Sequence, residues 1–429
     1  MLLKAKKLLD EAISIRRDLH KYPELAFLEY RTASKIINYL LDLGYDVKYG
    51  KDVADSKYIT DIPSLDKQES CIKQAILDGA NEYFIDNMKN GLTGVVAQIN
   101  TNKPGKTIAF RFDMDALEIC ETDDNNHIPN KLNFSSTYKN VMHACGHDGH
   151  VAIGLCLAKL IKENLDMFSG KFIFIFQPAE EGVRGANSMV KANIVNDVDY
   201  FFSGHIGIQA TNNDSLVSYS KNFLATSRFN VDFKGVSSHA ALAPEKGKNA
   251  LLASCSATLA LYSIVQHGQG ASRVNVGILN AGRTHNAVAG NANMVFQVRG
   301  ETNQINSDLE DKSLNIINHA AKMYDVDVNI KKLGYAKAIT FNDAFANELN
   351  DYLSTLNIYE NVIKEMDMNA SEDVTLFMEH VINNGGQASY LMFGSNITST
   401  HHSENFDFDE IVLYKAIATL ASLAYKYCK

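Results

Sequence analysis

Length, composition and charge place the chain among large globular proteins. Its 429 residues exceed one typical domain, so we expect two domains or one domain with an insertion. Hydrophobic residues make up 46% and charged residues 21%, which excludes disorder as the main state, and a net charge of -9 without a block of Lys or Arg argues against nucleic-acid binding.

The first half of the chain predicts helices followed by alternating strands and helices. Residues 1–20 carry charges throughout, which indicates an amphipathic helix and neither a signal peptide nor a membrane span. A second helix covers residues 29–44, and residues 51–90 form a polar stretch with weak helical periodicity. Strands are then expected at GVVAQI, KTIAFRF, KFIFIF and DYFFSG, with helices at HVAIGLCLAKLIKENL and GANSMVKANIV. This alternation predicts an α/β domain with a largely parallel central sheet flanked by helices.

The second half begins with a different order of elements. After about residue 222, the pattern is strand-helix-strand-strand-helix-strand, which is the split βαβ order of a ferredoxin-like α+β domain. Its strands are SRFNVDFKG, SRVNVGILNAG, NANMVFQVRGET and VDVNIKKLG, and its helices are NALLASCSATLALYSIVQH and SLNIINHAAKMYD. A strand, ASYLMFG, and a final helix at residues 410–428 complete the chain. We therefore predict a catalytic domain at residues 1–222 and 334–429, interrupted by an inserted domain at residues 223–333.

The cysteines indicate a cellular compartment. The six cysteines are spread over the chain without paired spacing, which is typical of reduced thiols and not of a disulfide framework. We therefore predict a cytoplasmic protein.

Potential metal ligands follow the ends of several predicted strands, where open α/β sheets place their sites. They are Asp113 and Asp115 after the second of these strands, Glu180 and Glu181 after the third, His205 after the fourth, and His401 and His402 after ASYLMFG. Taken singly, each of these side chains has an ordinary explanation as a surface or core residue. Their common position at strand ends predicts one shared site.

The segment HACGHDGH, at residues 143–150, predicts a metal site. A lone histidine is usually structural, but His143, Cys145, His147 and His150 occur together directly before an apolar helix. No second cysteine pair has the spacing of a structural zinc finger. Imidazole suits zinc, manganese, cobalt or nickel, and the thiolate favours a softer ion.

The adjacent glutamates and Asp115 fit the other needs of a hydrolytic metal site. Glu180 and Glu181 are either two solvated carboxylates or, in a metal enzyme that activates water, one general base and one ligand. Asp115 is interpreted as a group that orients a histidine ligand and not as a ligand itself.

The predicted inserted domain carries three further candidates. His239 precedes a turn, Asn286 lies in GRTHNAVAG, and Arg299 ends a strand, where a surface arginine is the ordinary interpretation. If this domain faces the site, Asn286 and Arg299 suit a substrate carboxylate, because arginine binds carboxylates in a bidentate manner.

Together, the motifs HACGHDGH, FQPAEEG, GHIG, GVSSHAA and HHSENFDFDE resemble the signatures of the two-metal amidohydrolases and aminoacylases. This metallopeptidase family includes indole-acetyl-amino-acid hydrolases, hippurate hydrolases and glutamate carboxypeptidases, and the resemblance covers essentially the whole chain. Two positions depart from it: Asn286 is followed by Ala-Val-Ala instead of a Val-Val-Pro or Val-Ile-Pro run, and Ser403 is followed by Glu404 instead of the usual proline. The first departure puts the turn after Asn286 in doubt.

The resemblance implies a role for each matching residue. Cys145 would be a thiolate that bridges two divalent cations, zinc or manganese. The other metal ligands would be His147, Glu181, His205 and His402, although His401 could stand in for His402. Glu180 would be the general base and His239 would stabilise the tetrahedral oxyanion, whereas substrate would be bound by Asn286, Arg299 and Gly394.

The implied activity is hydrolysis of the amide bond between an aromatic acyl group and an amino acid, with aminobenzoyl-glutamate as the expected substrate. The alternatives are a broad-specificity N-acyl-amino-acid hydrolase and a non-catalytic subunit of a hetero-oligomeric hydrolase. The resemblance also implies that the inserted domain acts as a lid and forms a homodimer, and that a heteromer with a second, related chain can form. No nucleic-acid or membrane partner is expected.

Overall fold

The computed structural model describes all residues from 1 to 429, which form two compact units. The first unit comprises Met1–Lys221, Thr340–Asp367 and Leu376–Lys429. The second comprises Asn222–Ile339 and Met368–Thr375. The second unit therefore extends beyond the predicted residues 223–333 and includes a segment distant in sequence.

Strand and hydrogen-bond geometry explains these boundaries. The last strand of the second unit continues to Ala336, because it remains paired with Thr226 up to that residue. Residues 368–375 join the unit through backbone hydrogen bonds, in which Asn369 N donates to Asn222 O and Leu224 N donates to Ala370 O.

The first unit is built on a mixed sheet of eight strands. Their order is β1 (Asp46–Tyr49), β2 (Val95–Asn100), β4 (Lys171–Gln177), β3 (Thr107–Asp113), β5 (Tyr200–Ile206), β14 (Gln387–Phe393), β6 (Ser215–Val217) and β12 (Asn361–Ile363). The central strands β4, β3, β5 and β14 are parallel, as predicted, but β2 and β6 are antiparallel to their inner neighbours. The short β2–β3 link, residues 101–106, has no helix to cross the sheet, so the two strands must run in opposite directions.

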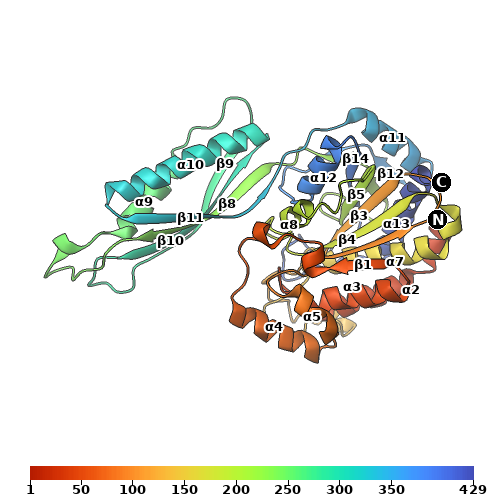
Figure 1. The fold of residues 1–429 in the computed structure, drawn as a ribbon, viewed down its shortest axis with the longest axis horizontal. Coiled ribbons are helices and arrows are strands. Elements are labelled where there is room, and N and C mark those ends of the chain that lie inside the picture. Colours follow the sequence, from red (N-terminus) through yellow and green to blue (C-terminus); the bar gives the residue numbers. More distant parts are fainter. The chain divides into compact units, whose positions relative to one another are not determined.

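Helices enclose this sheet (Figure 1). They are α1 (Leu2–Lys6), α2 (Leu9–Lys21), α3 (Tyr30–Asp42), α4 (Leu65–Leu77), α5 (Glu82–Met88), α6 (Ile128–Lys131), α7 (His147–Glu163), α8 (Ala186–Lys191), α11 (Asp343–Ser354), α12 (Val374–Asn383) and α13 (Ile411–Tyr427). The helix predicted at residues 1–20 is divided into α1 and α2, and the polar stretch at residues 51–90 contains α4 and α5. Short 3-10 helices lie at Gly50–Asp52, Ser56–Tyr58 and Leu165–Met167, and β7 (Ser220–Lys221) pairs in parallel with β13 (Met366–Asp367).

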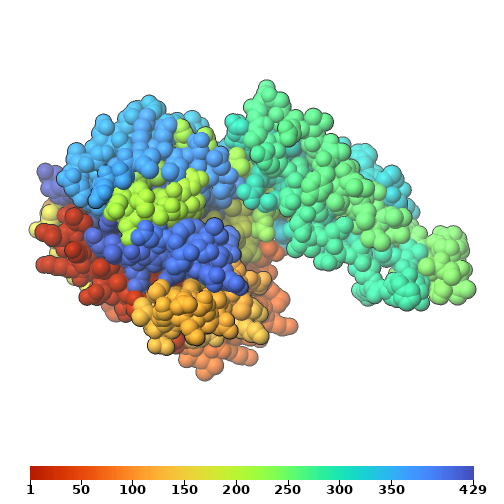
Figure 2. Space-filling view, turned by 180° about the vertical axis from the view of Figure 1, so that it is seen from behind, coloured from red at the N-terminus to blue at the C-terminus, as the bar shows by residue number.

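The two ends of the chain meet in the first unit. Helices α2, α7 and α13 pack against one another, and α1 also contacts α13. Figure 2 shows the red N-terminal and dark blue C-terminal segments side by side on one surface of this unit. None of the helices combines the length and the apolar character that crossing a lipid bilayer requires.

The core of the first unit explains its strongest sequence signal. Strands β3 and β4 are buried on both faces, with only their first residue partly exposed. Aromatic side chains fill the space around them, among them Phe110, Phe172, Phe174 and Phe176. Continuous apolar runs such as KFIFIF are typical of strands covered on both faces.

The second unit has the predicted ferredoxin-like order. Its antiparallel sheet has the order β11 (Asp327–Ala336), β8 (Ala225–Lys234), β10 (Asn291–Gly300) and β9 (Ser272–Ala281). Helices α9 (Ala250–Tyr262) and α10 (Asn303–Met323) cover one face (Figure 1), and a short 3-10 helix lies at Pro244–Lys246. Along β10, buried and partly exposed residues alternate, so every second side chain faces away from the helices.

Candidate metal centre

The carboxyl ends of the parallel strands bring the predicted ligands together. Asp113 is the last residue of β3, Glu180 and Glu181 follow β4, and His205 lies near the end of β5. Helix α7 begins at His147 with Gly146 as its N-cap, in a left-handed conformation that glycine adopts without strain. Neighbouring parallel strands therefore deliver side chains from distant parts of the sequence to one place.

Two groups of possible ligands share the thiol of Cys145. One group contains Cys145, His147 and His205, and the other contains Cys145, Glu181 and His402. Within each group, all ligand atoms lie within 4.8 Å of one another. The Cys145 Sγ atom is 3.4 Å from His205 Nε2, and Glu181 Oε1 is 3.2 Å from His402 Nε2. A thiolate common to two sets of donors is the arrangement that a pair of cations requires.

Backbone carbonyls orient two of these histidines. His147 Nδ1 lies 2.9 Å from the carbonyl oxygen of Asp115, and His205 Nδ1 lies 2.8 Å from that of Ile206. A carbonyl can only accept a hydrogen bond, so Nδ1 of each ring carries the proton. The Nε2 atom of each ring is thereby directed at the centre, and His147 Nε2 is buried without a hydrogen-bond partner. A buried nitrogen without a partner, fixed by a carbonyl behind the ring, fits a metal ligand.

Charges around the centre favour a cation. Burial alone would lower the pKa of His147, but Asp113 and the thiol of Cys145 hold it well above its usual range. Contacts with Cys145 and then Glu181 raise the pKa of His402 to about 10. The pKa of His205 is instead lowered by burial and by neighbouring histidines, which keeps this imidazole neutral. The donor set therefore presents negative charge and a neutral nitrogen, and both suit a divalent ion.

The structure distinguishes the two adjacent histidines near the C-terminus. His402 lies at the centre, and its backbone N–H donates to Ala144 O at 2.8 Å. His401 points elsewhere: its Nε2 donates to Ile206 O at 2.9 Å, and its ring packs on Phe406. His402 adopts a left-handed conformation, with φ of 64°, which turns the two rings in different directions. The geometry thus places His402, and not His401, beside Cys145 and Glu181.

Asp115 fixes both glutamates. Its carboxylate accepts hydrogen bonds from the backbone N–H of Glu180 at 3.0 Å and of Glu181 at 2.9 Å. Its carbonyl orients His147, so one residue positions three members of the site. This geometry agrees with the interpretation of Asp115 as an orienting group.

The loop that carries the glutamates is strained and tethered. Ala179 and Val183 both adopt left-handed conformations, with φ of 53° and 56°, which are unfavourable for residues other than glycine. Glu29 holds this loop, because its carboxylate accepts hydrogen bonds from Ala179 N at 2.9 Å and from Thr93 Oγ1 at 2.5 Å. Burial, followed by the charge of Asp115, raises the pKa of Glu29 to about 8. Sequence reasoning missed Glu29, because no local pattern links it to a loop so far along the chain.

The remaining residues of HACGHDGH support the centre from behind. His150 Nδ1 lies 2.5 Å from Asp113 Oδ1, while its Nε2 accepts from Ile206 N at 3.0 Å. Both nitrogens of His150 are therefore occupied. Asp148 is buried in an ion pair with Arg16 at 2.8 Å and also contacts His20 at 2.8 Å. Cys145 and His147 reach the centre, whereas Asp148 and His150 hold the surrounding elements in place.

The candidates of the second unit have a different environment. His239 is exposed, and its Nδ1 accepts hydrogen bonds from the backbone N–H groups of Ala241 and Leu242, both at 3.2 Å. Because Nδ1 is an acceptor, the ring proton lies on Nε2. The segment after Asn286 is held by an antiparallel bridge between His239 and Ala287, so this turn does not require the family's proline.

Gly394 lies directly after β14, and its size is required by packing. A Cβ atom at this position would come within 2.2 Å of the backbone oxygens of Asn212 and Ser215. Only glycine fits such a close backbone approach. Its predicted contact with substrate remains a prediction.

Comparison with known proteins gives a consistent family assignment. Residues 109–426 match Peptidase family M20/M25/M40. The indole-3-acetyl-aspartic acid hydrolase of Enterobacter agglomerans is 42% identical over 98% of this chain and 97% of its own length. One of the chains of the p-aminobenzoyl-glutamate hydrolase of Escherichia coli K12 is 41% identical over 96% of this chain and 94% of its own length. The crystal structure of an aminobenzoyl-glutamate utilization protein from Klebsiella pneumoniae superposes with a TM-score of 0.85 at 36% identity, covering 98% of this chain and 97% of that one.

Proposed function

Because the chain belongs to Peptidase family M20/M25/M40, we propose that it hydrolyses the amide bond between an aromatic acyl group and an acidic amino acid. The relatives named for indole-acetyl-aspartate and aminobenzoyl-glutamate support this substrate class. Aminobenzoyl-glutamate, cleaved to aminobenzoate and glutamate, is the specific substrate that we propose.

One observation carries the proposal: a complete donor set converges around Cys145, with an additional carboxylate beside it. The residues that would hold two divalent cations, zinc or manganese, are Cys145, His147, Glu181, His205 and His402. When bound, such ions supply Lewis acidity for attack on the amide. Glu180 stands next to these donors, with its Oε2 atom 4.0 Å from His147 Nε2.

We assign the proton transfers to Glu180. As general base it takes a proton from the attacking water, and as general acid it delivers that proton to the nitrogen of the leaving amino acid. Glu180 is buried, and Asp115 fixes its backbone, so the carboxylate is held in one position for both transfers.

The second unit would supply contacts to the substrate. The protonated Nε2 of His239 is suited to donate a hydrogen bond to the oxyanion of the tetrahedral intermediate. Asn286 and Arg299 would bind the carboxylate of the substrate, and Gly394 of the first unit would line the substrate site. We further propose that the second unit acts as a lid and forms a homodimer, that a heteromer with a second, related chain can form, and that the protein is cytoplasmic.

A substrate panel with metal analysis tests the proposal. The purified chain, loaded with zinc or manganese, is assayed on aminobenzoyl-glutamate, indole-acetyl-aspartate, hippurate and acetyl amino acids. We expect the two aromatic acyl derivatives of acidic amino acids to be cleaved most efficiently, with activity lost on chelation and restored by metal. Equal efficiency on all substrates would indicate a broad aminoacylase. Absence of turnover by the metal-loaded protein would indicate a non-catalytic member of a hetero-oligomer.

A further inference from the structure

Two arginines of the second unit lie side by side without a counter-charge. Arg273 on β9 and Arg299 on β10 are direct partners in the antiparallel register. Their neighbours Val274 and Val298 are also partners and belong to the hydrophobic core under the helices. Because successive residues of a strand point to opposite faces, both arginines lie on the face that the helices leave uncovered.

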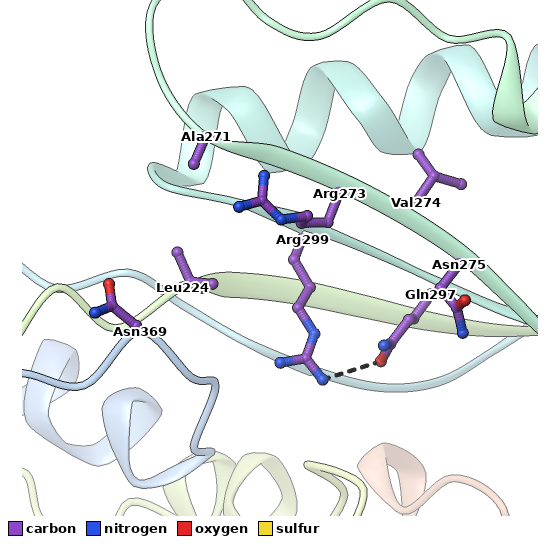
Figure 3. Close-up of a pocket in the computed structure, with 8 residues that line it drawn as sticks. All are labelled: Leu224, Ala271, Arg273, Val274, Asn275, Gln297, Arg299 and Asn369. Atoms are coloured by element: carbon purple, nitrogen blue, oxygen red, sulfur yellow. Dashed lines mark hydrogen bonds between the residues drawn. The ribbon is translucent and has the colours of Figure 1, made fainter. Parts of the chain in front are cut away.

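These arginines line an open pocket of about 520 Å³ within the second unit (Figure 3). The other lining residues are Leu224, Ala271, Val274, Asn275, Gln297 and Asn369. No acidic side chain is among them. The wall therefore offers two guanidinium groups and three amides, with leucine and alanine as small apolar contacts.

Neither arginine has its hydrogen-bonding capacity satisfied. The Nε atom of Arg299 is buried without a partner, and its Nη2 donates only to Gln297, at 3.3 Å. Arg273 is exposed and donates to its neighbouring carbonyl, Ser272 O, at 3.1 Å. Like charges placed directly opposite each other on antiparallel strands are destabilising. A buried donor without a partner adds a further cost, so this pair is explained best by an anion that binds to it.

We propose that Arg273 is a specificity-determining residue, which binds the side-chain carboxylate of an acidic amino acid while Arg299 binds its α-carboxylate. Figure 3 shows that the two side chains diverge, since Arg299 extends towards Gln297 and Arg273 extends towards Ala271. Diverging guanidinium groups suit two carboxylates of one molecule better than a single carboxylate. This inference rests on the proposed function and explains why aspartate and glutamate derivatives would be preferred.

The test compares two substrates that differ by one charge. Arg273→Gln is assayed on an aromatic acyl-glutamate and on the corresponding acyl-glutamine. Hydrogen bonds to charged groups predict that kcat/KM for the glutamate substrate falls about 10-fold to 100-fold, with less than about two-fold change for the glutamine substrate. The control is Lys234→Gln, at the other end of β8, which removes a positive charge outside the pocket. It should change neither value by more than about two-fold, because exposed charges contribute little.

Calorimetric binding of glutamate and glutamine, measured on the same metal-loaded proteins, separates this inference from the proposed function. We expect the wild-type chain to prefer glutamate and Arg273→Gln to lose that preference, with unchanged thermal unfolding of the variant. If the wild type cleaves neither acyl substrate, the proposed function fails, but a glutamate preference that depends on Arg273 would still support the site. Equal losses on both substrates, or an unchanged preference in the variant, would overturn the assignment of Arg273.

Discussion

Histidines in the two units are held in opposite tautomers. In the first unit, His147 and His205 donate from Nδ1 to backbone carbonyls, which leaves Nε2 as a Lewis base. In the second unit, His239 accepts backbone N–H groups on Nδ1, which leaves the proton on Nε2. The same side chain thus becomes a metal ligand in one place and a hydrogen-bond donor in the other. The backbone behind the ring decides which chemistry is available.

The two units also differ in how they hold their functional groups. The first unit buries His147 and His205 and fixes them with hydrogen bonds from residues that are themselves buried. The second unit leaves His239 and Arg273 exposed. We therefore expect substitutions in the first unit to affect proton transfer, metal binding and stability, and substitutions in the second to affect the substrate.

The largest expected effect is that of Glu180→Gln. This change removes the proton-transferring carboxylate but retains the size of the side chain, so kcat should fall about 10²-fold to 10⁴-fold. Metal content should stay at the wild-type level, because Glu180 is not among the proposed ligands. Steady-state kinetics and elemental analysis of the same sample measure both quantities. A variant with a nearly normal rate would show that Glu180 is not the base.

His239→Ala is expected to have the next largest effect and sharpens the comparison of tautomers. Loss of one donor to an oxyanion costs about 10²-fold to 10³-fold in kcat. Metal content should not change, since this histidine has its lone pair engaged by Ala241 and Leu242. The matched control is His319→Ala, an exposed histidine on α10 whose Nδ1 donates to a helix carbonyl. Metal loss in His239→Ala, or an equal fall in the control, would contradict the donor role.

Asp115→Asn tests the hydrogen bonds behind the metal centre. The amide group would turn one acceptor into a donor that faces the N–H of Glu180 or Glu181. Supporting residues of this kind usually change metal affinity about 10-fold to 100-fold. Competition with a chromogenic chelator measures the affinity, with exposed Asp86→Asn as the control. Unchanged affinity would mean that the loop holds its ligands without Asp115.

The sequence predicts the position of this site better than its internal order. The strand ends indicate where Asp113, Glu180 and His205 would meet, and family motifs add the roles. The tautomers depend on carbonyls of residues 115 and 206, and the loop tether depends on Glu29; neither leaves a local pattern in the sequence.

Two errors in the predicted fold have readable causes. The direction of β2 was available from the short link that follows it, since a link without a helix reverses the chain. Helix α12 is absent from the predicted elements although Val374, Phe377, Met378 and Val381 have the spacing of a buried helical face.

The smallest expected effect on activity, and the sharpest contrast in burial, concerns His20. This buried ring lies 2.8 Å from Asp148 and 3.1 Å from Glu121. Burial and Arg16 would lower its pKa, but the two carboxylates raise it to about 9, from the ordinary value of 6.5. The charged ring therefore stabilises the fold fully below pH 6.5, and this contribution is lost as the pH rises to about 9. The shift corresponds to at most about 3 kcal/mol.

His20→Gln should thus be less stable than the wild type at pH 6, and the difference should shrink towards pH 9. Thermal unfolding at several pH values and constant metal concentration measures this difference. The control is His267→Gln in the second unit, because His267 lies 3.2 Å from Asp308 in a partly exposed pair, and such pairs contribute little to stability. A difference between wild type and His20→Gln that stays constant from pH 6 to 9 would mean that the buried network does not hold this ring in its charged form. In that case Asp148 would be stabilised by Arg16 alone, and the contrast between buried and exposed histidine pairs would not extend beyond the metal centre.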